Sequence, residues 1–166
     1  MYHGERFNAY SHLAGSMLAV AALVLMTVKA NGPYQLASAL TYGICLILLY
    51  LGSTLYHSIP QPKIKAILQK VDHCMIYLLI AGSYTPFTLI PLKGSWGWSL
   101  FGVSWGLALF GIIQELTIGR KSEKRLLSMM IYIIMGWLIL VAVSPLVRTL
   151  PFAGLFWLAL GGILYS

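Results

Sequence analysis

Long apolar runs, separated by short polar segments, extend along the whole chain. A helix needs about 20 apolar residues to cross the hydrocarbon core of a bilayer. The pattern therefore predicts five complete membrane spans and the start of a sixth, at about 7–28, 35–58, 72–91, 95–115, 126–146 and 150–166. The alternating segments of about ten residues that are typical of a β-barrel do not occur. We expect an all-α, polytopic membrane helix bundle with one transmembrane domain over 1–166, truncated at its C-terminal side inside the sixth run.

The composition supports a lipid environment. Hydrophobic residues make up 59% of the chain and charged residues only 9%, which is too little charge to cover a soluble globule of 166 residues. Cys45 and Cys74 both fall in apolar runs, so a disulfide framework is not expected. The net charge of +7 does not indicate nucleic acid, because the aromatic residues are not interleaved with the basic ones. Membrane lipids are the expected partners.

The Lys and Arg residues are distributed unevenly between alternate connections. Three of them, Lys29, Lys93 and Arg148, lie on one predicted side of the membrane. The other eight lie on the opposite side, at Arg6, Lys63, Lys65, Lys70, Arg120, Lys121, Lys124 and Arg125. The positive-inside rule makes this second side cytoplasmic. We therefore expect a multi-pass protein of the cell (plasma) membrane with a cytoplasmic N-terminus.

Polar residues from three separate segments converge on the same cytoplasmic end. They are Glu5, Asn8, Ser11 and His12 at the first helix, Ser53 and His57 at the second, and Asp72 and His73 at the third. Ser53 and His57 are four residues apart and share a helix face. A neutral imidazole is a good zinc ligand, and a neighbouring hydroxyl or carboxylate orients it or its water. Asp72 is a candidate to bind a metal, to hold a water on it, or to act as a general base.

Structural alternatives exist for each of these residues. His57 is also explained as an interfacial histidine that hydrogen-bonds a neighbouring helix, and Asp72 as a charge that complements the positive end of its helix. Glu5 is also explained by ordinary helix-start chemistry. Glu115, at the end of the fourth run, is expected to pair with the basic connection that follows. A stripe of small residues, Gly102, Gly106, Ala108 and Gly111, is expected to allow close helix packing.

The chain resembles the hemolysin III family, which is related to the progestin and adipoQ receptors and more distantly to the alkaline ceramidases. The motifs that carry the resemblance occur in order along successive helices: Glu5-x-x-Asn8-x-x-Ser11-His12, Ser53-x-x-x-His57, Asp72-His73 and Ile80-Ala81-Gly82-Ser83-Tyr84-Thr85-Pro86. The resemblance implies a seven-helix membrane protein with zinc near the inner leaflet. It implies that His57 is a zinc ligand, that Asp72 acts through a water, and that Ser53 supports them.

The resemblance also implies two further zinc ligands from a His-x-x-x-His motif on the last helix, and this sequence contains no such motif. Catalytic zinc sites use three protein ligands. His57 alone does not make such a site, so we expect this chain to bind zinc weakly.

The implied function is a zinc-dependent hydrolase of lipid amide or ester bonds, with Asp72 and Ser53 as catalytic residues. A membrane-active hemolysin or channel-like protein is a second hypothesis, although these runs lack the polar faces that a pore requires. A sensor or regulator of membrane state, without chemistry of its own, is a third.

Overall fold

The computed structural model describes residues 4–118 and 122–165, and every regular element within these residues is a helix. The predicted all-α class is therefore confirmed. The elements are α1 (Arg6–Val28), α2 (Pro33–Ser58), α3 (Pro62–Leu89), α4 (Ser95–Ile118), α5 (Ser122–Trp137), the 3₁₀ helix η1 (Leu138–Ala142), α6 (Val143–Thr149) and α7 (Phe152–Tyr165).

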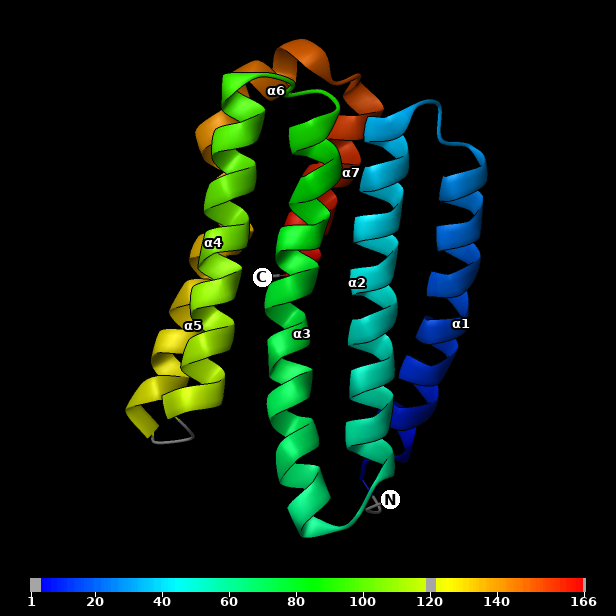
Figure 1. Ribbon diagram of the computed structural model, residues 1–166, viewed down its shortest axis with the longest axis vertical. Helices are drawn as coiled ribbons and strands as arrows, with labels where there is room; N and C mark the ends of the chain where they lie inside the picture. The colour runs from blue at the N-terminus through cyan, green and yellow to red at the C-terminus, as the bar shows by residue number, and fades with distance from the viewer. Residues whose placement is uncertain (1–3, 119–121, 166) are drawn as a thin grey trace.

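The helices form an antiparallel bundle with α3 at its centre. α3 packs against α2 on one side and α4 on the other, while α1 packs against α2 (Figure 1). The N-terminal end of α1, the α2–α3 connection and the adjoining ends of α4 and α5 lie together at one end of the bundle (Figure 1). We call this the N-terminal end. Segments that are far apart in the sequence, including all those with predicted site residues, therefore meet there.

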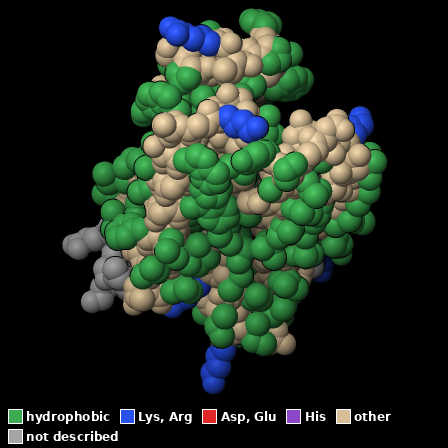
Figure 2. Space-filling model, turned by 45° about the horizontal axis from the view of Figure 1, so that its top comes forward, with side chains coloured by type: hydrophobic (Ala, Val, Ile, Leu, Met, Phe, Trp, Pro, Cys, Tyr) green, Lys and Arg blue, Asp and Glu red, His purple; other side chains and the backbone are tan. Residues whose placement is uncertain are grey.

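The outer surface of the bundle is suited to lipid. Within the described residues, four stretches are long and apolar enough to cross a membrane, namely Arg6–Val28, Pro33–Ser58, Ser95–Thr117 and Leu126–Thr149. On the face shown in Figure 2, hydrophobic side chains spread over much of the surface, and the few Lys and Arg side chains lie apart from one another. The protein is thus a multi-pass membrane protein.

The third helix begins ten residues earlier than the sequence predicted, at Pro62 instead of 72. Pro62 takes the first helical position, where its missing N–H is not needed and its fixed φ favours the helix. The three lysines that follow, Lys63, Lys65 and Lys70, are unwelcome in hydrocarbon but are good helix formers. A search for uncharged residues finds the lipid-compatible part of a helix and misses such an extension.

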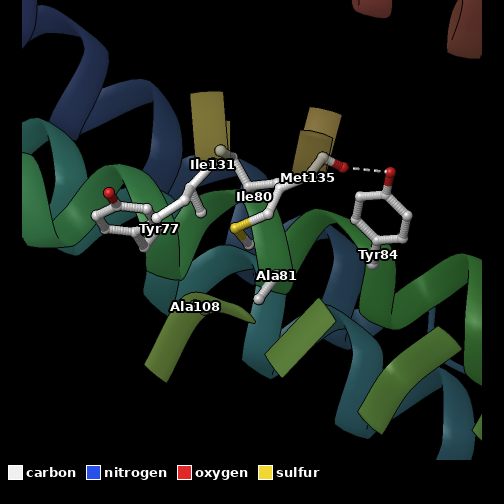
Figure 3. Close-up of a cluster of buried hydrophobic side chains, with 7 residues drawn as sticks. All are labelled: Tyr77, Ile80, Ala81, Tyr84, Ala108, Ile131 and Met135. Atoms are coloured by element: carbon white, nitrogen blue, oxygen red, sulfur yellow. Dashed lines mark hydrogen bonds between the residues drawn. The ribbon is translucent and has the colours of Figure 1, made fainter. Parts of the chain in front are cut away.

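The fifth predicted helix, 126–146, is interrupted because a side chain from α3 enters its hydrogen-bond ladder. In a regular helix the N–H of Ile139 would donate to the carbonyl of Met135. Here the Ile139 N–H donates to the hydroxyl of Tyr84 at 2.8 Å, and this hydroxyl donates to the Met135 carbonyl at 2.6 Å (Figure 3). The inserted phenol opens the helix, which continues as η1 and then α6.

The core lies where α3, α4 and α5 meet. It consists of the buried side chains of Tyr77, Ile80, Ala81, Tyr84, Ala108, Ile131 and Met135 (Figure 3). Of the predicted small-residue stripe, Ala108 and Gly111 pack in this region, whereas a methyl group added at Gly102 or Gly106 would meet open space.

This difference predicts opposite outcomes for two glycine substitutions on one helix. Gly111→Ala would drive its new methyl group into the ring of Tyr77, and we expect it to lower the stability in detergent by about 1–3 kcal/mol. Gly106→Ala should leave stability unchanged or raise it slightly, because alanine favours a helix more than glycine does. Thermal unfolding followed by circular dichroism measures both, and equal transition temperatures would contradict this packing.

Candidate functional site

The start of α1 is fastened to α3 by a charged hydrogen bond. The Nζ atom of Lys65 donates to Oε2 of Glu5 at 2.6 Å and to the backbone carbonyl of Tyr56 at 3.0 Å. It also lies 4.4 Å from the centre of the Tyr56 ring, a cation–π distance. Glu5 occupies the N-cap position of α1 without a capping hydrogen bond from its side chain. Glu5 thus stands at the helix start, as its structural alternative expected, but its carboxylate links α1 to α3 and does not cap the helix.

His57 lies beside this link, near the end of α2. Its Nδ1 atom is 3.8 Å from Oε1 of Glu5, which is too long for a hydrogen bond. The Nδ1 atom is buried and has no hydrogen-bond partner among the described residues. The structural alternative, in which His57 hydrogen-bonds a neighbouring helix, thus finds no support at this nitrogen.

His12 approaches His57 from α1. The two ring centres are 5.9 Å apart and nearly perpendicular, and the ring of Tyr50 flanks His12 at 5.8 Å. The Nδ1 atom of His12 is also buried and unpartnered within the described part of the chain. Asn8 and Ser11 are exposed, and the Ser11 hydroxyl donates to the Asn8 carbonyl within the helix. Of the predicted residues on the first helix, Glu5 and His12 therefore reach the site, whereas Asn8 and Ser11 do not.

Ser53 and Asp72 lie at about the same level of the bundle. A methyl group added at Gly52 would lie 3.5 Å from Met75 and 3.9 Å from Val71, which places this turn of α2 against the turn of α3 that carries Asp72. Ser53 is buried here, and Asp72 is half-buried.

His57 lies about one turn, or roughly 5 Å, closer to the N-terminal end than Asp72 does. Its neighbour Tyr56 contacts Lys65 and accepts a hydrogen bond from Gln69 at 2.8 Å, so this part of α2 faces the turns of α3 before Asp72. His12 interacts with both residues: its ring contacts the ring of His57, and it feels the charge of Asp72. In residues 4–118 and 122–165, no three His, Cys, Asp or Glu side chains are close enough together to hold a metal ion as they stand.

A second polar cluster lies on the other side of α3. Nδ1 of His73 is 3.0 Å from Oε1 of Glu115, and the hydroxyl of Ser128 donates to Oε2 of Glu115 at 3.5 Å. The hydroxyl of Tyr132 donates to the His73 carbonyl at 3.1 Å. These contacts join α3, α4 and α5. Arg120 and Lys121, the expected partners of Glu115, lie outside the described residues.

The sequence profile of the family described as "Haemolysin-III related" matches residues 1–166. The chain belongs to this family. Hemolysin-3 of Bacillus cereus is 46% identical over 165 residues, which cover 98% of this chain and 74% of the relative. The Hemolysin-3 homolog of Bacillus subtilis (strain 168) is 45% identical over 165 residues, covering 98% of this chain and 76% of the relative.

A more distant similarity extends to animals. The human protein named monocyte to macrophage differentiation factor is 27% identical over 169 residues, covering 95% of this chain and 66% of that protein. No solved structure matches the chain. The expected hemolysin III resemblance is thus confirmed, and this haemolysin-III-related protein spans about three quarters of the length of its two bacterial relatives.

Proposed function

We propose that this protein is a zinc-dependent hydrolase of lipid amide or ester bonds, acting at the cytoplasmic leaflet of the plasma membrane. The observation that supports this proposal is the buried Nδ1 atom of His57, which has no hydrogen-bond partner among the described residues. Leaving a buried polar atom unpaired costs about 1–3 kcal/mol. Coordination of a metal ion would satisfy this nitrogen, as it does in histidine-ligated zinc sites.

The residues at the N-terminal end fit zinc by the chemistry of their donor atoms. His57 would hold the metal, and the carboxylates of Glu5 and Asp72 would offset its charge. When bound, zinc would act as a Lewis acid on the substrate carbonyl and on water. A carboxylate oxygen of Asp72 would accept the proton of the attacking water, and the buried hydroxyl of Ser53 would orient that water by a hydrogen bond.

The location of the site supports a substrate that comes from the bilayer. The helices around it expose apolar side chains to lipid, so an acyl chain meets a compatible surface on its way to the polar cluster. The excess of Lys and Arg in the segments at this end supports a cytoplasmic orientation, with the N-terminus inside the cell.

Hydrolysis in reconstituted vesicles tests the proposed function. The purified protein is placed in vesicles that contain N-acyl sphingoid lipids and glycerophospholipids, with zinc in excess, and released fatty acid is measured by mass spectrometry. We expect release that a chelator abolishes, that zinc restores, and that His57→Gln lacks. His73→Gln is the matched control, because His73 bonds Glu115 instead of facing the site. Equal release by the two variants, or none by the wild type, would reject the proposal.

The names of the two bacterial relatives favour a second candidate, a membrane-lytic protein. Dye leakage from the same vesicles distinguishes it from the hydrolase. Leakage without fatty acid release, unchanged by chelator and by His57→Gln, would support lysis. Fatty acid release from vesicles that stay sealed would support the enzyme.

A further inference from the structure

We propose that His12 is a second metal-binding imidazole, which binds one zinc-like ion together with His57 between α1 and α2. The inference rests on the metal site of the proposed function but requires no hydrolysis. The sequence places His12 among the polar residues that converge on this end of the bundle, without a metal-binding role. The structure adds the contact with His57, 45 positions further along the chain.

The geometry of the two rings is close to that of a shared ion. Two imidazoles that bind one zinc tetrahedrally, with metal–nitrogen bonds of about 2.0–2.1 Å, have ring centres roughly 5 Å apart. The rings of His12 and His57 are 5.9 Å apart and inclined at 82°. A small side-chain rotation would therefore bring one nitrogen of each ring to a common point.

Hydrogen bonding supports the same interpretation. Buried histidines in helix bundles normally use both ring nitrogens. Here the Nδ1 atoms of both His12 and His57 are buried without a partner among the described residues, in two rings that touch. A single divalent ion would satisfy both nitrogens at once.

The surrounding charges favour a cation. Glu5 lies 3.8 Å from Nδ1 of His57, and the negative charge of Asp72 acts on His12 from a longer range. No three side chains of the described residues reach a common ion directly. In the proposed site, Asp72 would act on the ion through a water. Two imidazoles with one carboxylate form a ligand set suited to divalent transition metals.

This arrangement revises the expectation of weak zinc binding, which counted His57 alone. Cobalt(II), which replaces zinc and absorbs visible light, is the probe. The purified full chain in detergent is titrated with Co²⁺ alone, and bound metal is followed by its absorption and by competition with Zn²⁺. We expect one ion per chain, and an affinity at least tenfold lower in both His12→Gln and His57→Gln. His73→Gln should stay within twofold of the wild type.

A variant that gains a new absorption band separates loss of a metal ligand from misfolding. Cysteine thiolate is also a zinc and cobalt ligand. His12→Cys should therefore show the near-ultraviolet charge-transfer band of a cobalt–thiolate bond, which a purely structural role for His12 would not produce. The wild type, with its buried Cys45 and Cys74, and the control His73→Cys should lack the band.

The outcomes separate this inference from the proposed hydrolysis. Absence of the band in a folded His12→Cys variant, equal affinities of His12→Gln and His73→Gln, or no cobalt binding by the wild type would each overturn the role of His12. Cobalt binding that depends on His12, without any fatty acid release, would support His12 and reject only the hydrolase.

Discussion

Asp72→Asn should reduce zinc-dependent fatty acid release by about 10²–10⁴-fold, the usual contribution of a general base. Asparagine keeps the shape of the side chain, but it replaces one acceptor oxygen by an NH₂ donor and does not accept a proton at neutral pH. Asp72 lies level with the buried Ser53, and its charge reaches His12, so its loss affects the centre of the site. The rate at saturating substrate should be measured, because the substitution removes the general base of the chemical step and leaves the lipid-facing surface intact.

Glu115→Gln is the matched control for this prediction. Like Asp72, Glu115 is a partly buried carboxylate. It bonds His73 and Ser128 on the opposite side of α3, away from the proposed site. We expect the rate of this variant to stay within a few-fold of the wild type. If Asp72→Asn keeps full activity, or if both variants fall equally, Asp72 has no special chemical role.

Tyr84→Phe should destabilise the protein by about 1–3 kcal/mol, the cost of leaving buried polar groups unpaired. The phenol removed donates to the Met135 carbonyl, as Figure 3 shows, and accepts a hydrogen bond from the Ile139 N–H. Phenylalanine retains the ring in the core but neither hydrogen bond. Unfolding in mixed detergent micelles, followed by circular dichroism, gives the change in free energy.

Hydrogen exchange gives a local measurement of the same effect. The Ile139 amide should exchange faster in Tyr84→Phe than in the wild type, while the amides of α2 should not change. Tyr10→Phe is the control, because Tyr10 is 65% exposed on α1. Stability and Ile139 exchange that match the wild type would show that the helix closes its own ladder once the phenol is gone.

Much of this architecture follows from local patterns. Runs of apolar residues indicate the membrane helices because hydrocarbon excludes charge along the whole span. The convergence of Glu5, His12, Ser53 and Asp72 also follows, since short connections force consecutive helices to alternate in direction. The break in the fifth run did not follow, because it depends on a hydroxyl of α3 that lies 55 positions before Ile139.

The details of the site required the structure for a related reason. Glu5 and Lys65 are 60 positions apart, and His73 and Glu115 are 42 positions apart. Such pairings depend on the rotation of each helix about its axis, and that rotation is set by packing at positions such as Gly52 and Gly111. The contact between the His12 and His57 rings depends on the same rotation, which leaves Asn8 and Ser11 of the same motif exposed.

The central place of α3 has a consequence for how this protein enters the bilayer. α3 is not among the helices that are apolar enough to cross by themselves, since it carries Asp72, His73 and the polar residues around Ser83. Only three residues separate it from α2. We expect the two helices to leave the translocon together as a hairpin, with α3 shielded from lipid by α2 until α4 arrives.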